Sequence, residues 1–395
     1  MDQIKKFYIT SFLKNQTYFT PILIVFLQAQ NLDYQQIFWV FTIGSIASFL
    51  LEIPTGIIAD LYGKKKSVII SKFGIFLSFI IFGFAKSFWL FVLAQFMFEI
   101  GNSFRSGTET AFVFDYLEQN KERKGVPKYT EVKGKQKFWA RAGESIATAA
   151  GGMIASRLGY SWVFFIAAVP AFINFILAIS WEDIKERKEK INLKSSINHA
   201  KESLIEIATN KSLRRITINI MIFTSVLAAL NKFIQPYMTN ANIPIEWFGF
   251  IYAGSLALTA LAVRYSYLIE DRFGKRKTIN VLSLLAVIPA VIIGLGFVSI
   301  IGVILFFAIL IIENIRSPIA NNYFHTRIKS FNRATLGSIL EQLKSIGKII
   351  ILPVAGFFAE SYSLYTAVLI MGGILLINSF FFYVKKRRHD NMKSA

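Results

Sequence analysis

Long apolar segments recur along the whole chain, from Phe7 to Val384, and 54% of the 395 residues are hydrophobic. A transmembrane helix needs about 20 consecutive apolar residues, whereas a soluble domain cannot cover this much apolar surface. At about 33 residues for each helix with its loop, the chain fits about twelve spans. We therefore predict an all-α integral membrane protein of twelve transmembrane helices. The expected spans are Phe7–Gln28, Gln36–Ala59, Ser67–Ala85, Phe88–Tyr116, Phe138–Arg157, Tyr160–Trp181, Leu213–Tyr237, Ile245–Ile269, Thr278–Phe297, Ile300–His325, Ala334–Phe358 and Tyr362–Val384.

A short motif occurs twice, each time between two expected spans. Each copy has an acid, a short spacer, a glycine and a basic run, and the copies cover Gly56–Lys66 and Glu270–Lys277. An internal repeat in a chain this apolar indicates a membrane protein of two related halves. We expect six-helix halves at residues 1–181 and 213–395, joined by a charged linker at 182–212.

The basic residues follow a pattern that predicts topology. The net charge is +20, and Lys and Arg gather in every second loop, whereas the other loops hold almost none. Basic loops lie on the cytoplasmic side of membrane proteins. We therefore expect a multi-pass protein of the plasma (inner) membrane with both termini in the cytoplasm. Anionic lipid headgroups are the expected partners of the basic loops, and no soluble domain is present to bind nucleic acid.

Several chemistries lack the residues that they need. The chain has no cysteine, and its three histidines are scattered, so we expect no metal site and no cofactor. A phosphate-binding loop of the G-x-x-x-x-G-K-[ST] kind is missing, which disfavours a pump driven by ATP. No cluster of histidines or carboxylates with a nucleophile marks a membrane enzyme. We predict that the protein is not an enzyme.

The first copy of the motif, Gly56-x-x-x-Asp60-x-x-Gly63-Lys64-Lys65, resembles the signature between helices two and three of the major facilitator superfamily. The second copy resembles its degenerate partner between helices eight and nine. The resemblance covers the whole chain in architecture and implies a secondary transporter, which we expect to be a monomer. It also implies that the motif favours one of two access states; the alternative is a purely topological anchor. The motif residues concerned are Gly56, Asp60, Gly63, Lys64 and Lys65 in the first copy and Asp271, Gly274, Lys275 and Arg276 in the second.

Elementary chemistry gives these motif residues separate tasks. Gly56 is expected to let another helix approach closely, and Gly63 to permit a tight turn. Asp60 ends a helix where it can meet the positive N-terminus of a neighbouring helix. The lysines that follow hold the loop at the lipid headgroups. The motif departs from the usual pattern at Leu61 and Lys64, and the second copy has Tyr267 where the first has Gly56.

Ionisable side chains lie inside the expected spans, where each costs about 2.5–3.5 kcal/mol near the helix centre. In span four, Glu99, Asn102, Ser106 and Glu109 fall on one face of a continuous helix, with Arg105 beside them. In span ten, Arg316 is separated from Arg105 by as many residues as Asp271 is from Asp60. The further members of this predicted polar cavity are Glu313 and Asn314 in span ten, Glu341, Lys344 and Lys348 in span eleven, and Lys232 in span seven.

These residues admit two interpretations. In the functional one, Glu99 and Glu313 couple transport to protons, and a set of basic residues holds an anionic substrate or gates the carboxylates. That set is Arg105, Lys232, Arg316 and Lys344. In the structural one, Arg–Glu pairs such as Arg105–Glu109 merely lock helices together.

The leading functional hypothesis is a secondary active transporter that moves a small molecule by alternating access. Its first form is proton-coupled efflux of amphipathic compounds, because the chain is rich in aromatic residues. The alternative is proton-coupled uptake or exchange of an organic anion, which the basic residues within the spans favour. From a different class, the chain is a non-transporting scaffold or receptor on a transporter fold.

Overall fold

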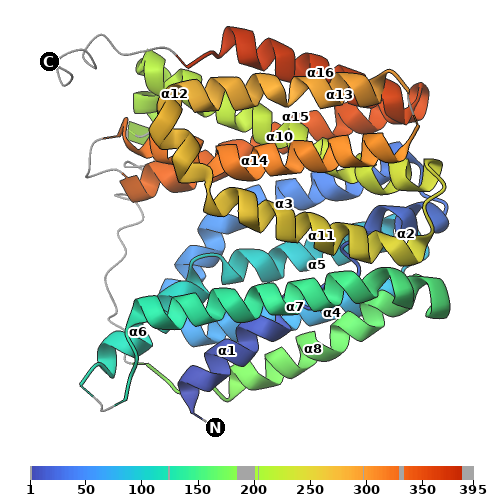
Figure 1. The fold of residues 1–395 in the computed structure, drawn as a ribbon. Helices are drawn as coiled ribbons and strands as arrows, with labels where there is room; N and C mark the ends of the chain where they lie inside the picture. Colours follow the sequence, from blue (N-terminus) through green and yellow to red (C-terminus); the bar gives the residue numbers. More distant parts are fainter. Residues whose placement is uncertain are drawn as a thin grey trace, which may run out of the picture. The chain divides into compact units, whose positions relative to one another are not determined.

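The computed structural model describes residues 2–122, 125–184, 201–202, 204–296, 298–328 and 333–384. In this part of the chain every regular element is a helix (Figure 1). Most of the predicted linker at 182–212 lies outside the described residues, as does the basic tail after Val384.

The chain divides into two compact units that exchange short segments. Unit 1 comprises residues 1–32, 40–189 and 243–254, and unit 2 comprises residues 33–39, 190–242 and 255–395. The first turn of α3 therefore belongs to unit 2, and the first turns of α11 belong to unit 1. The sequence suggests a simpler division, into halves at residues 1–181 and 213–395. That division stays a prediction.

Unit 1 is built mainly from the helices that precede the linker. α4 packs against both α5 and α8, and α1 packs against α7 (Figure 1). Phe7, Phe112 and Trp181 meet in its core. The helices are α1 (Gln3–Leu13), α2 (Leu23–Ala29), α3 (Tyr34–Tyr62), α4 (Lys64–Phe84), α5 (Phe88–Arg105), α6 (Thr108–Gln119), α7 (Tyr129–Leu158) and α8 (Trp162–Ile179).

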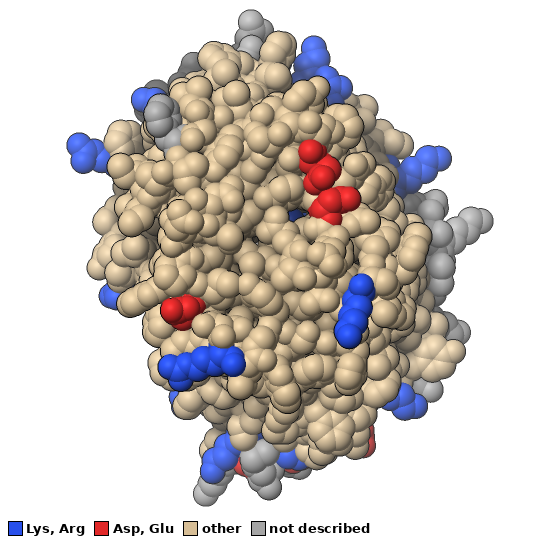
Figure 2. Space-filling model, turned by 90° about the vertical axis from the view of Figure 1, so that its right-hand side faces the viewer, with Lys and Arg blue, Asp and Glu red and all other residues tan. Residues whose placement is uncertain are grey.

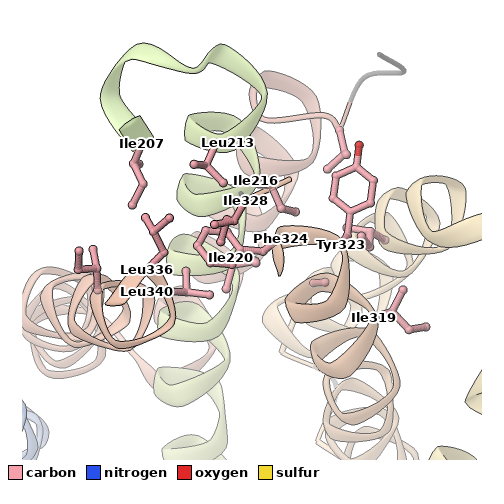
Figure 3. Close-up of a cluster of buried hydrophobic side chains, with 14 of the residues drawn as sticks. Ile207, Leu213, Ile216, Ile220, Ile319, Tyr323, Phe324, Ile328, Leu336 and Leu340 are labelled. Atoms are coloured by element: carbon pink, nitrogen blue, oxygen red, sulfur yellow. The ribbon is translucent and has the colours of Figure 1, made fainter. Parts of the chain in front are cut away.

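Unit 2 is organised around α10, which packs against α14, α15 and α16. Figure 3 shows part of its apolar core, where Leu213 and Ile216 of α10 lie near Phe324 and Leu336 from α14 and α15. The helices are α10 (Lys211–Asn240), α11 (Ile245–Arg264), α12 (Ser266–Leu285), α13 (Val287–Gly294), α14 (Ile300–His325), α15 (Arg333–Ser361) and α16 (Leu364–Phe381).

Nine helices of the described part are long and apolar enough to cross a membrane. Much of the apolar surface faces outward, as at Ile304 and Phe380, which are 62% and 70% exposed. Such a surface requires lipid around it. Figure 2 shows one face on which residues other than Lys, Arg, Asp and Glu cover most of the area.

The three remaining predicted spans differ from the nine for separate reasons. Span one is broken into α1 and α2, because the stretch from Lys14 to Ile22 is not helical and contains Pro21, which cannot donate a helical hydrogen bond. Span four is broken into α5 and α6 at Gly107, whose φ is +73°. Span five is part of the longer α7, whose first turns carry many polar residues.

Glycines on α7 allow neighbouring backbone to approach closely. A Cβ at Gly143 would lie 2.4 Å from the carbonyl oxygen of Phe12, and one at Gly151 would lie 2.0 Å from that of Tyr18. Both distances are too short for a real contact. The end of α1 and the irregular stretch that follows it therefore lie directly against α7, and small residues at these two positions are required by packing.

Candidate functional site

A buried ion cluster lies at the centre of the polar residues in unit 1. The two oxygens of the Glu109 carboxylate accept hydrogen bonds from Lys14 and Lys72, each at 2.6 Å. The side chains of Lys72 and Glu109 are only 2% and 7% exposed, and that of Lys14 is 24% exposed. The cluster joins α4 and α6 to the residue that follows α1.

The position of Glu109 corrects the prediction for span four. Ser106 and Gly107 interrupt the helix, because Gly107 adopts a positive φ that ends α5 and starts α6 in a new direction. Glu109 therefore does not continue the face that carries Glu99 and Asn102. The expected Arg105–Glu109 lock is also wrong, since Arg105 donates instead to Asn102 at 2.8 Å.

Asn102 and Arg105 line a separate polar cavity of about 340 Å³ between α3 and α5. Glu99, one turn earlier, is half-buried and accepts a hydrogen bond from Gln95 at 2.9 Å. The sequence thus identified two of the lining residues. The full lining comprises Ser48, Glu52, Asn102, Ser103, Arg105 and Ser106.

Arg316 is the central buried cation of unit 2, at 1% exposure. Its Nε donates to Ser283 at 2.8 Å, another guanidinium nitrogen donates to Asn219, and the group lies 3.9 Å from the centre of the Phe223 ring. These partners are all neutral. Among the described residues, no ion pair to Arg316 is formed.

The polar residues around Arg316 do not form the single cluster that the sequence suggested. Asn314 is exposed and donates to the carbonyl of Leu310, so it points away from the buried Arg316. The reason is geometric, because residues two apart on a helix face different directions. Glu313 is half-buried and feels the charges of Lys348 and Arg316 without a hydrogen bond in the described part.

On α15, Lys344 donates to Glu341 at 2.6 Å. Lys344 is largely buried, whereas the Glu341 side chain is 57% exposed. The pair therefore spans from the interior of unit 2 to its surface. Lys232 lies on α10 and is half-buried.

Both copies of the loop motif contain the turn that the sequence predicts. Gly63 and Gly274 have φ values of +103° and +73° with ψ near 141° and 149°, so the backbone repeats as well as the sequence. Gly274 interrupts α12 in the way that Gly63 separates α3 from α4. Both glycines thus lie at a turn whose backbone conformation favours glycine.

The charged motif residues find partners that the sequence did not name. Lys64 pairs with Asp115 of α6, Lys65 lies 3.1 Å from Asp183, and Lys275 lies 3.6 Å from Glu270. The first two contacts tie the first turn to α6 and to the residues that follow α8. Arg276 is half-buried on α12.

Two expected roles in the motif are not seen. A Cβ at Gly56 would meet nothing within 4 Å, so none of the described helices approaches closely there. Asp60 and Asp271 are exposed, and within the described residues neither forms a hydrogen bond or ion pair. For Asp60, the predicted contact with a helix N-terminus is therefore not formed within the described part.

Lys14 and Lys72 were missed by the reasoning from sequence. A signal existed for Lys72, because a single lysine within an apolar span marks a functional site by default. Lys72 and Ser283 are also separated by as many residues as Arg105 and Arg316. The repeat thus places Lys72 against Glu109 in unit 1 and Ser283 against Arg316 in unit 2.

Comparisons with known proteins agree with this architecture. The chain is 23% identical over 387 residues to the uncharacterized MFS-type transporter YxaM of Bacillus subtilis, covering 94% of this chain and 93% of that protein. It is 24% identical over 261 residues to the uncharacterized MFS-type transporter MJ1560 of Methanocaldococcus jannaschii, covering 65% of each.

Solved structures show the same fold over almost the whole chain. The nucleoside transporter NupG superimposes with a TM-score of 0.81 at 16% identity, covering 98% of this chain and 100% of that one. A D-xylose–proton symporter gives a TM-score of 0.71 at 11% identity, covering 97% of each. The model of the Major Facilitator Superfamily matches residues 8–340. The chain therefore belongs to the Major Facilitator Superfamily, a family of multi-pass membrane transporters and not of enzymes.

Proposed function

We propose that this secondary transporter moves a small organic anion by alternating access and couples the movement to protons. The observation that carries the proposal is the cluster around Glu109. Two ammonium groups and one carboxylate leave one net positive charge among largely buried side chains. Because a charge inside a span is unfavourable, surplus positive charge there indicates a ligand that brings a negative charge.

The charges in unit 2 also favour an anionic substrate. Arg316 is buried and donates hydrogen bonds to the neutral partners Ser283 and Asn219, while the Glu313 carboxylate acts on its charge without an ion pair in the described part. Lys348 adds a second basic group near Glu313. An anion that passes these groups gains attraction in an environment of low dielectric constant.

Efflux of amphipathic compounds, the first choice from composition, stays a prediction. The efflux hypothesis was based on the high aromatic content of the chain. Many of the described aromatic rings, however, pack against one another within one unit. Phe7 and Trp181 have ring centres 5.1 Å apart, and Phe19 and Phe164 are stacked at 5.0 Å. These contacts account for the rings through packing, whereas nothing comparable accounts for the surplus of buried lysine.

Glu313 is the proposed site of proton coupling. It lies within α14, is half-buried, and forms no hydrogen bond among the described residues. Protonation would remove its charge without breaking a contact, and the neighbouring Lys348 would then be free to attract an anion. Glu109 is less suited to this task, because its protonation would leave Lys14 and Lys72 without a counter-charge.

We also propose a membrane orientation and an oligomeric state for the protein. The basic loops support a plasma-membrane location with both termini in the cytoplasm, and anionic headgroups beside those loops. The working unit is a monomer with halves at residues 1–181 and 213–395. Alternating access by such halves is the mechanism proposed for transporters that are built from repeats.

The test is a flux assay in proteoliposomes with an imposed pH gradient. Radiolabelled mono- and dicarboxylates are compared with neutral amides of the same size and with amphipathic cations. The proposal is supported if the pH gradient accelerates uptake of a carboxylate and the matched amide does not compete with that uptake. Transport of the amphipathic cations alone would favour efflux of amphipathic compounds, and no movement of any solute would favour a scaffold.

A further inference from the structure

Unit 1 contains another cavity, which shares Lys14 with the Glu109 cluster and whose other lining residues belong neither to that cluster nor to the loop motif. It lies between the end of α1, the start of α6 and the first half of α7, and its volume is about 420 Å³. Small-molecule sites usually measure about 300–1,000 Å³, so a small ligand fits. The lining residues are Ser11, Lys14, Thr110, Tyr129, Lys133, Gln136, Lys137 and Ala140.

The lining is basic. It contains Lys14, Lys133 and Lys137, and none of the described lining residues is acidic. Lys133 donates to the hydroxyl of Thr110 at 3.2 Å and lies 5.8 Å from the centre of the Tyr129 ring. The Glu109 carboxylate, which is not part of the lining, also acts on its charge. In the described part Lys137 forms no ion pair. Three ammonium groups around one cavity repel one another, and the Glu109 carboxylate that acts on them is already paired with Lys14 and Lys72.

A buried polar group in the same cavity lacks a partner. Gln136 is only 7% exposed, and its Oε1 atom forms no hydrogen bond within the described part of the chain. Its Nε2 atom reaches the carbonyl of Phe7 only at 3.5 Å. A buried amide without good hydrogen bonds is unfavourable, so its side chain is available to a ligand in the cavity. The Nε2 group carries a second N–H besides the one that donates to Phe7, and this N–H can donate to an anion.

We propose that this lysine pocket binds the carboxylate or phosphate group of an anion. Lys133 and Lys137 supply the charge, and the Gln136 amide supplies a directed donor. Lys14 lines the pocket and also forms the ion pair with Glu109. An anion bound in the pocket therefore weakens that ion pair and changes the electrostatics of the buried Glu109 cluster. The site goes beyond the proposed function, because the pocket binds an anion whatever solute the protein moves.

Binding is measured on the full-length protein in detergent, by titration calorimetry and thermal shift with inorganic phosphate and with glutarate. Lys137→Gln is expected to weaken binding of the preferred probe at least about tenfold, since one charge-assisted hydrogen bond is lost. Lys135→Gln is the matched control: it removes a lysine on the same helix that pairs with Glu131 at 2.8 Å and does not line the pocket. If both variants weaken probe binding equally, the proposal of an anion site in this pocket is wrong.

If Lys137→Gln folds poorly, a second variant, Gln136→Glu, tests the same pocket. Gln136→Glu places a carboxylate among the three lysines, so the protein would supply its own anion. We expect it to abolish binding of both probes while the melting temperature stays equal or rises. Probe binding at the affinity of the unmodified protein would contradict the proposal.

The anion can be a dissolved solute or the headgroup of a lipid, and two arms separate these sources. Thermal shift is repeated in nanodiscs of phosphatidylcholine alone and with phosphatidylglycerol. A stabilisation by phosphatidylglycerol that Lys137→Gln removes identifies a headgroup, and a stabilisation confined to the dissolved probes identifies a solute. If neither depends on Lys137, the pocket proposal fails. Anion flux that depends on Lys72 and not on Lys137 would leave the proposed function standing.

Discussion

The Lys72 ammonium lies 2.6 Å from the Glu109 carboxylate, and both side chains are almost completely buried. The pair joins α4 to α6, and Lys14 extends it to the end of α1. A buried charge that loses its partner is far less stable than a complete pair, although the pair itself adds little net stability. Glu109 therefore holds together three segments that would otherwise expose two lysines to an apolar interior.

We predict that Glu109→Gln destabilises the protein by about 3–5 kcal/mol, because Lys14 and Lys72 lose the carboxylate with which they pair. The thermal midpoint in detergent, followed by intrinsic fluorescence, measures the effect. Glu131→Gln removes a carboxylate from the exposed pair with Lys135 and should change stability by no more than about 0.5 kcal/mol. Similar midpoints for both variants would show that the buried pair is not needed for stability.

Arg316 depends on the shape of its guanidinium group as well as on its charge. Its contacts with Ser283, Asn219 and the Phe223 ring use the planar fork and face of the group. A lysine keeps the charge and loses this geometry. We predict that Arg316→Lys lowers stability by about 2–4 kcal/mol, from two lost hydrogen bonds and the lost contact with the ring.

The control for Arg316→Lys is Arg276→Lys, at a half-buried position on α12 for which the described contacts include no hydrogen bond. It should leave the thermal midpoint within about one degree, as surface substitutions usually do. A midpoint for Arg316→Lys equal to that of the unmodified protein would mean that only the charge at this position matters.

The spans were predictable from the sequence because they follow from apolar runs alone. The predicted span ten and α14 have the same ends, Ile300 and His325. The break at Gly107 was not predictable, since one glycine in a long apolar stretch is usually tolerated in a helix. Residues after that break were therefore assigned to the wrong face, as Glu109 shows.

Contacts between distant residues also could not be predicted. Lys72 and Glu109 lie 37 residues apart, and their meeting depends on how α4 packs against α6. The repeat could have pointed to Lys72, because Ser283 occupies the matching position beside Arg316. Sequence symmetry thus locates equivalent sites in the two halves, whereas the partner in each site is set by packing.

The glycines of the loop motif differ sharply in what they tolerate. Gly63 and Gly274 have positive φ, which an alanine adopts only with strain, so each Gly→Ala change should cost about 1–3 kcal/mol. A Cβ at Gly56 meets nothing and lies within the helix α3, where alanine is favoured by up to about 1 kcal/mol. Thermal midpoints of the three alanine variants test this. A loss for Gly56→Ala as large as that for Gly63→Ala would show that Gly56 packs closely in another access state.

Proton coupling through Glu313 predicts a specific defect. Glu313→Gln removes the titrating group while keeping its size, so we expect counterflow exchange of the substrate to continue at about its normal rate. Accumulation driven by a pH gradient should fall at least about tenfold. Glu341→Gln is the matched control, because this residue lies on the adjoining α15, is exposed, and pairs with Lys344 one turn away. If Glu313→Gln slows exchange and driven uptake equally, Glu313 acts in substrate binding or folding and the proton is carried elsewhere.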